Sequence, residues 1–261
     1  MPVTSAKSAL ADTALSLRLP EESIHERFLQ IQQDVLAHSR YVREPNFTAI
    51  HPQDLEFLFA AYDHRFFAGL CQRALDGCRI KFRLSARMTK CGGTTTRFTA
   101  RTGEVSFQIA IASSMLFDTF NNPDRRITVC GLECENRLEA LQRIFEHEIV
   151  HLTEQLSWQT SNCAAPRFQE IAGRLFLHRA HTHNLVTRRE LAQRSGIHVG
   201  SRVTFVFEGR RLTGRVNRIT KRATVLVEDS AGQKYSDGLR YKTYYVPIAH
   251  LELAHSHRAQ A

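Results

Sequence analysis

The chain contains no apolar run that approaches the length of about 20 residues needed to span a membrane. Its first residues also lack the short apolar core of a secretory signal peptide. We therefore expect a protein that neither spans a membrane nor is secreted, and that resides in the cytoplasm. Hydrophobic residues make up 43% of the 261 positions, which is ample for a packed core in one or two domains.

Cysteine is scarce, and its spacing is not that of a disulfide framework. The six cysteines include no C-x-x-C pair: Cys71, Cys78, Cys91, Cys130, Cys134 and Cys163. Reduced thiols in a reducing compartment are therefore the simpler interpretation.

One motif stands out, the run from Phe145 to His151, which reads Phe-Glu-His-Glu-Ile-Val-His. Apolar residues recur around it at helical spacing, without Pro or Gly, and this predicts one helix over about residues 136–157. His147 and His151 are four residues apart, so they lie on the same face of that helix. Two imidazoles in this arrangement can bind one zinc ion, each at about 2.0–2.1 Å.

Glu148 directly follows the first histidine, where its carboxylate can take a proton from a water molecule beside the metal. The pattern His-Glu-x-x-His therefore predicts metal-assisted hydrolysis, usually of a peptide bond. The alternative is a pair of structural histidines on a packed helix. Two imidazoles and a carboxylate on an apolar face are costly to bury without a function, so the sequence favours the metal site.

A zinc site of this kind needs a third protein ligand, and the sequence offers several. Cys163 lies in an expected loop between Trp158 and Ala165, before a second helix that starts near Pro166. A thiolate is a strong zinc ligand, and a position before a helix N-terminus favours the thiolate form. Cys163 is therefore the predicted ligand, and four other residues stay open: Glu170, His178, His181 and His183.

Before the motif, the pattern predicts a compact α+β arrangement. Residues 1–45 are expected to form an N-terminal part, with a mobile tail over 1–20 and a helix over 21–39. Alternating apolar residues then predict a small antiparallel sheet after a helix from Pro52, with strands at 79–84, 92–98, 104–111 and a short piece at 126–129. A peptide substrate would add to the edge of this sheet as an extra strand, along the zinc cleft.

Several stretches of this part occur in a distinctive order: Asp63-His64-Arg65-Phe66-Phe67 with Gly69-Leu70, Phe82-Arg83-Leu84-Ser85 with Gly92-Gly93, Phe107 to Ile111, and Leu138 to His151. Together they resemble the SprT-like (Spartan-type) zinc metalloprotease domain over roughly residues 52–185. The resemblance implies a zincin-like fold over residues 46–187, a zinc ion, and cleavage of proteins, which in the best-known members are crosslinked to DNA.

The resemblance also implies roles for single residues. His147 and His151 would be zinc ligands, and Glu148 would be the general base. The family's third ligand is a His four residues before a helix Phe, but the residue four before Phe168 is Ala164, and Cys163 is the nearest usable group. A later run, from Leu175 to Leu185, resembles bacterial members and is interpreted as the end of the last helix with its cap, and not as part of the catalytic site.

A second domain is expected after a boundary at about residues 188–197, where the periodicity changes from helix to strand. Strands are predicted at 202–207, 212–219, 223–228 and 241–246, with turns at Gly209 and around 230–232. This pattern predicts a small all-β barrel over residues 197–254, which resembles SH3-like barrels.

Positive charge is concentrated in this second part. From Val186 to Ala261 there are 14 Lys and Arg against 6 Asp and Glu, so this part carries +8 of the net charge of +9. Tyrosines are interleaved with a cluster of candidate nucleic-acid-binding residues: Arg210, Arg211, Arg215, Arg218, Lys221 and Arg222. Cations bind phosphates and aromatic rings stack on bases, so the pattern favours DNA or RNA as a partner. A solvated basic face, or a peptide ligand, is the alternative.

Two functions follow from the sequence. The first is a zinc metalloendopeptidase whose C-terminal part holds it on nucleic acid, with a protein or peptide as substrate. The second is a non-catalytic nucleic-acid-binding protein in which zinc only stabilises the scaffold.

Overall fold

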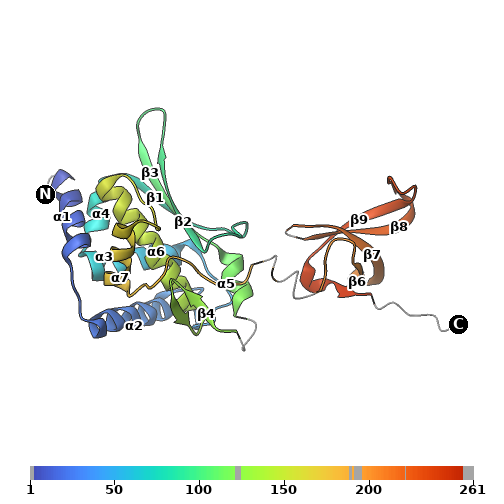
Figure 1. Cartoon of the computed structure of the whole chain (residues 1–261), viewed down its shortest axis with the longest axis horizontal. Helices are drawn as coiled ribbons and strands as arrows, with labels where there is room; N and C mark the ends of the chain where they lie inside the picture. The colour runs from blue at the N-terminus through green and yellow to red at the C-terminus, as the bar shows by residue number, and fades with distance from the viewer. Residues whose placement is uncertain (1–2, 121–124, 188–189, 191–195, 221, 255–261) are drawn as a thin grey trace. The chain divides into compact units, whose positions relative to one another are not determined.

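The computed structural model describes residues 3–120, 125–187, 190, 196–220 and 222–254, which belong to two units, Met1–Val186 and Thr187–Ala261 (Figure 1). Each unit has its own hydrophobic core. The first unit is α+β and the second is a β-sheet, as the sequence predicts. None of the described helices combines the length and the apolar content that a membrane crossing requires.

The described part of the first unit contains seven α-helices: α1 (Val3–Ser16), α2 (Glu21–His38), α3 (Pro52–Phe67), α4 (Leu70–Leu75), α5 (Ser113–Thr119), α6 (Arg137–Trp158) and α7 (Pro166–Phe176). Its strands are β1 (Arg79–Leu84), β2 (Gly93–Thr99), β3 (Val105–Ile111), β4 (Ile127–Val129) and β5 (Leu132–Cys134). The predicted helices over 21–39, from Pro52, over 136–157 and from Pro166 are confirmed, as are the four predicted strands.

The expectation of a mobile tail over residues 1–20 is wrong, because α1 is a docked helix. Leu10 and Ala14 on its inner face are fully buried in the core of the first unit. The Arg174 guanidinium, from α7, donates hydrogen bonds to the carbonyl oxygens of Ala14 and Leu17 at the helix end. Ala14 lies in the last turn of the helix and Leu17 directly follows it, so the distant arginine caps the helix end.

The predicted antiparallel sheet is in fact mixed, with the order β1-β3-β2. β2 and β3 form an antiparallel hairpin, whereas β1 runs parallel to β3 from Arg79 opposite Ser106 to Leu84 opposite Ile111. Alternation of apolar residues predicts a strand but not its direction, which explains the error. β2 is consequently an edge strand, with one side of its backbone unpaired in the sheet.

The motif helix α6 lies against this sheet and packs on β2 and β3 (Figure 1). Asn136 caps its first turn, because the Asn136 side chain accepts a hydrogen bond from the Glu139 backbone N–H at 3.0 Å. Aromatic rings join the layers: Phe59 and Phe82 are tilted to one another with 5.6 Å between their centroids, and Phe82 stacks on Phe145 with 6.4 Å between theirs. The helix that carries the candidate ligands is therefore held rigidly by the core.

The described part of the second unit forms a sheet of five antiparallel strands in the order β10-β6-β7-β8-β9. Their bounds are β6 (Arg202–Phe207), β7 (Arg210–Ile219), β8 (Ala223–Lys234), β9 (Arg240–Val246) and β10 (Glu252–Leu253), with a short 3₁₀ helix η1 (Ile248–His250). The sheet is not closed into a barrel, because β9 and β10 are its two edges among the described strands. The predicted SH3-like barrel is therefore corrected to an open sheet.

The turn predicted around residues 230–232 is also wrong, because these residues lie within β8. A Cβ on Gly232 would lie 2.3 Å from the backbone carbon of Tyr241, in β9. The glycine thus marks a close approach of two backbones at an irregularity in the pairing of β8 with β9, and not a chain reversal.

Candidate metal centre

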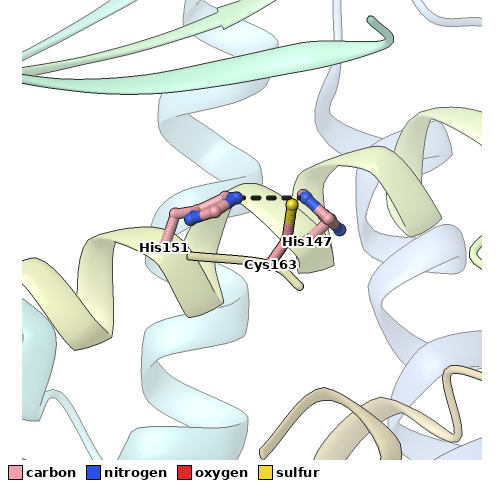
Figure 2. Close-up of side chains that lie close together, drawn as sticks. All are labelled: His147, His151 and Cys163. Atoms are coloured by element: carbon pink, nitrogen blue, oxygen red, sulfur yellow. Dashed lines mark hydrogen bonds between the residues drawn. The ribbon is translucent and has the colours of Figure 1, made fainter. Parts of the chain in front are cut away.

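Three of the predicted residues come together at the middle of α6 and the loop that follows it. The candidate ligand atoms of His147, His151 and Cys163 all lie within 4.8 Å of one another. The Nε2 atoms of His147 and His151 are 3.1 Å apart. Figure 2 shows the Cys163 side chain, from the loop between α6 and α7, pointing toward the place where these two nitrogens meet. The described residues contain no other group of this kind.

The spacing and chemistry of this triad fit zinc. Ligand nitrogens in a tetrahedral zinc site lie about 3.3 Å apart, and a ligand sulfur lies about 3.6 Å from a ligand nitrogen. Burial lowers the pKa of His147 to about 3, and it also lowers the pKa of His151. Both imidazoles are therefore neutral at neutral pH, with lone pairs available to a cation. Two imidazoles and a thiolate are a ligand set that zinc prefers.

A chain of hydrogen bonds fixes the orientation of His151. Its Nδ1 lies 2.6 Å from the Ser161 Oγ, which donates to the Glu154 Oε2 at 2.6 Å. Because the serine proton is committed to the carboxylate, Ser161 accepts from the imidazole, and Nδ1 is the protonated nitrogen. Nε2 is then the nitrogen that can bind metal. Arg167 completes the chain by donating from Nε to the Glu154 Oε1 at 2.6 Å.

His147 has a weaker partner of the same kind. Its Nδ1 lies 3.8 Å from the Cys130 Sγ, and that thiol donates to the Arg143 carbonyl oxygen at 3.7 Å. Cys130 is buried, and burial strongly raises its pKa, so the group beside His147 is a neutral thiol. Both histidines are thus oriented through Nδ1, which leaves both Nε2 atoms facing the common site.

Glu148 lies one residue beyond the first ligand, buried under the start of β2. Its Oε2 is 2.8 Å from the Thr95 Oγ1. A Cβ on Gly93 would lie 2.7 Å from the Glu148 Oε1, so only glycine leaves room for the carboxylate here. Burial raises the pKa of Glu148 to about 8, against a smaller lowering by the Thr95 hydrogen bond. A carboxyl with a raised pKa is a suitable proton acceptor and donor, and a nearby cation would lower this pKa.

The other candidate ligands lie elsewhere. Glu170 is exposed on α7, with its Oε1 3.9 Å from the Arg18 Nη2. His178 is buried and lies 2.9 Å from the Glu146 Oε2. The run from Leu175 to Leu185 ends α7 as predicted, since the helix stops at Phe176 and Leu177 is its cap. The later part of the run, with His181 and His183, lies beyond the cap and bridges to β4 through Val129 and His183. The cluster of His147, His151 and Cys163 leaves all of these residues out.

Glu146 builds a buried polar network on the other face of α6. Its carboxylate accepts hydrogen bonds from the Tyr62 Oη at 2.9 Å and from the Arg143 Nη1 at 3.0 Å. His178 contributes the third contact, described above. Burial would raise the pKa of Glu146, but the Arg143 charge and the hydrogen bond from His178 outweigh it and lower the pKa. Glu146 is therefore an ionised structural group, although it lies beside His147 in sequence.

A small cleft opens beside the cluster. Its volume is about 60 Å³, which is room for a few water molecules. His147 and Glu148 form one wall, Gly92 and Gly93 form another, and Cys91, Cys130 and His183 contribute to the remainder. Water and a substrate group can therefore reach the carboxylate from solvent.

The predicted basic cluster is divided between the faces of the open sheet. Arg211, Arg215 and Arg218 lie on β7, opposite Val206, Leu226 and Thr224. Val216 on β7 and its partner Val225 on β8 lie in the core, and side chains alternate between the two faces along a strand. The three arginines therefore share the face that points away from the core. Arg210 pairs with Phe207 and points to the core face, and Arg222 lies in the turn before β8. Lys221 lies outside the described residues.

The structure adds residues to this face that the sequence analysis did not select. Arg202 on β6 is opposite Arg215, and the exposed Tyr245 on β9 is opposite Thr224. Arg202 and Arg218 make no ion pair within the described part of the chain, whereas Arg215 lies 3.8 Å from Asp237. We call Arg202, Arg211, Arg215, Arg218 and Tyr245 the basic face. The strand register, which spacing along one strand does not reveal, is what brings them together.

The chain matches no model of a known protein family, no curated protein and no solved structure. The assignment of function therefore depends on the residues and their geometry.

Proposed function

We propose that the protein is a zinc-dependent metalloendopeptidase of the SprT-like, zincin type. The observation that carries this proposal is the convergence of His147, His151 and Cys163, with their ligand atoms within 4.8 Å, beside a buried glutamate at an open cleft. Three protein ligands leave one tetrahedral position for water or substrate, which is the arrangement of catalytic rather than structural zinc sites.

Zinc held by these three residues would supply Lewis acidity, which makes water acidic and a carbonyl carbon electrophilic. Glu148 would take a proton from the attacking water as its oxygen bonds to the carbonyl carbon of the scissile peptide. The same carboxyl would then give that proton to the departing nitrogen as the carbon–nitrogen bond breaks. The second proton of the water passes from the new carboxyl group to the amine. The sum is water plus a peptide bond giving a carboxylate and an ammonium group, with Glu148 returned to its starting state.

The edge strand β2 supports a protein as substrate. It begins at Gly93, beside Glu148, and the Gln155 side chain donates to the Thr95 carbonyl oxygen at 3.3 Å, which fixes the strand on α6. An extended peptide pairing with the outer side of β2 would replace Gln155 at the Thr95 carbonyl oxygen and would run past the cluster with its backbone held by hydrogen bonds. Such a site recognises the peptide backbone and is therefore tolerant of sequence.

The deciding experiment compares Glu148→Gln with wild type on an unfolded protein such as casein, with zinc content measured in parallel. Loss of the general base predicts a fall in cleavage of about 10²- to 10⁴-fold with unchanged zinc content. Glu170→Gln is the matched control, since Glu170 is exposed on the neighbouring helix, and it should cleave at the wild-type rate. Equal cleavage by Glu148→Gln and wild type would disprove the mechanism. Absence of cleavage by wild type would favour the zinc-stabilised, non-catalytic alternative.

We further propose that the basic face binds DNA or RNA and brings the protease to nucleic-acid-associated proteins. Arg202 and Arg218, which make no ion pair among the described residues, offer phosphate contacts, whereas Arg211 and Arg215 already lie beside Glu252 and Asp237. Tyr245, with 67% of its surface exposed, offers a ring for stacking. The test is the salt dependence of binding to a fluorescent oligonucleotide. Arg202→Ala and Arg218→Ala should each reduce the salt slope by about 1, whereas Arg210→Ala, on the opposite face, should change it less. Equal changes of the salt slope in all three variants would show that binding depends only on the total positive charge and not on the basic face.

A further inference from the structure

His183 lies in the wall of the metal cleft, in the segment after α7 that forms an isolated β-bridge with Val129. Backbone hydrogen bonds run from the Cys130 N–H to the Thr182 carbonyl oxygen at 2.8 Å and from the Asn184 N–H to the Thr128 carbonyl oxygen at 3.0 Å. Val129 and His183 form the bridge between these two bonds. The position of the imidazole is thus fixed by backbone pairing on both sides of it.

Two consecutive glycines, Gly92 and Gly93, lie between His183 and Glu148. A Cβ on Gly92 would lie 3.4 Å from the His183 Cδ2, and a Cβ on Gly93 would lie 2.7 Å from the Glu148 Oε1. His183 and Glu148 therefore flank the same two residues at the start of β2. A substrate that pairs with β2 from its first residue would enter the cleft that both side chains line.

The hydrogen bonding of His183 fixes its tautomer. The Leu185 backbone N–H donates to the His183 Nδ1 at 3.3 Å, so this nitrogen carries a lone pair and Nε2 carries the proton. Burial lowers the pKa of His183, which keeps the ring neutral at neutral pH. Nε2 has no hydrogen-bond partner among the described residues. The cleft thus contains one oriented N–H donor that nothing in the described structure uses.

We propose that His183 donates a hydrogen bond from Nε2 to the carbonyl oxygen of the scissile peptide, and that this bond strengthens as the oxygen becomes negative. The proposal rests on the proposed protease function and assigns the oxyanion-stabilising group for that reaction. His183 keeps its proton throughout, so proton transfer remains the task of Glu148. A preoriented donor of this type contributes most when charge develops on the oxygen, and it affects turnover more than substrate binding.

The kinetic test uses His183→Phe, which keeps a ring and removes the donor, and His183→Gln, whose amide can donate from a similar position. Cleavage of casein should show kcat reduced about 100-fold in His183→Phe with KM changed less than about threefold, and kcat at least about tenfold higher in His183→Gln than in His183→Phe. His64→Phe is the control, because His64 is exposed on α3 and does not line the cleft. It should retain kcat within about threefold.

Zinc content and the side-chain ¹⁵N shifts of His183 complete the test. We expect wild-type zinc content in the His183 variants, and an Nε2–H tautomer of His183 in the wild-type protein with and without zinc. An Nδ1–H tautomer, a kcat within threefold of wild type in His183→Phe, loss of zinc in both His183 variants, or a larger effect from His64→Phe would each overturn the inference. Those results leave the effect of Glu148→Gln intact, whereas wild-type protein that cleaves nothing would remove the proposed function and this inference together.

Discussion

Replacement of Ser161 by alanine should weaken zinc binding, although Ser161 is not one of the three candidate ligands. The serine hydroxyl lies 2.6 Å from the His151 Nδ1 and 2.6 Å from a carboxylate oxygen of Glu154, whose side chain is fully buried. Alanine would leave the Nδ1–H of His151 without an acceptor and would free the ring to rotate or to change tautomer. Ser161 also lies two residues before Cys163, so the same bond holds the loop that carries the thiol ligand.

The expected loss of zinc affinity follows from the role of residues that hydrogen-bond to metal ligands, because removing such a residue lowers metal affinity by about 10- to 100-fold. This corresponds to about 1.4–2.7 kcal/mol of binding free energy. The stability of the zinc-free protein should change by only about 1 kcal/mol, the value of a typical hydrogen bond. Metal binding should therefore respond more strongly than folding does.

The assay is competition for zinc against a chromophoric chelator, with urea unfolding of the zinc-free protein in parallel. Ser161→Thr keeps the hydroxyl and should recover most of the affinity. Thr160→Ala is the neighbouring control, because the Thr160 side chain is exposed and contacts only the Trp158 carbonyl oxygen, at 3.5 Å. A dissociation constant for Ser161→Ala within twofold of wild type would show that the hydrogen-bond chain does not orient His151.

Three further predictions concern α6 and its surroundings. Cys163→Ala should reduce zinc content at equilibrium with a chelator, and retention of zinc at the wild-type level would remove the cysteine from the ligand set. Glu146→Ala should lower the free energy of unfolding, measured in urea, by about 3–5 kcal/mol, because the Arg143 charge would stay buried without its partner. The control is Glu133→Ala, which removes one partner of an exposed ion pair and should lower the free energy of unfolding by less than about 1 kcal/mol. Because the pKa of Glu146 is lowered in the folded protein, its ionised form stabilises the fold at neutral pH, and this contribution should disappear as the pH falls below the ordinary carboxyl range. The free energies of unfolding of wild type and Glu146→Gln, measured in urea, should therefore converge in acid.

The motif helix and the metal cluster could be predicted because their signals are local. The apolar period around the motif gave α6 to within about one residue at each end, as helix boundaries allow. Cys163 could be predicted because a thiolate is a strong zinc ligand and this cysteine lies in the loop directly after the helix. The hydrogen-bond partners of the two histidines could not be predicted, because nothing in the local sequence marks Ser161 or Cys130. Only the fold of the loop and of the β4–β5 hairpin brings Ser161 to the Nδ1 of His151 and Cys130 to the Nδ1 of His147.

The errors in the fold have a common cause, which is that they depend on contacts distant in sequence. The helix over Val3–Ser16 is stabilised by packing and by Arg174, so composition alone suggested a tail. The direction of β1 relative to β3 and the open edges of the C-terminal sheet are properties of strand pairing and not of any one strand. The interpretation of the run from Leu175 to Leu185 as the end of a helix with its cap holds for its first residues, because α7 ends at Phe176 and Leu177 is its cap with a left-handed φ of 60°. It fails for His183, whose pairing with Val129 depends on a contact distant in sequence.

The contact between Arg174 and α1 also constrains how the first unit is made. The acceptor carbonyl of Leu17 and its guanidinium donor are separated by 157 positions along the chain. On a ribosome the opening helix therefore emerges long before its docking partner exists, with Leu10 still exposed to water. Contacts between such remote segments form slowly, so this unit should reach its final shape only after translation has passed α7.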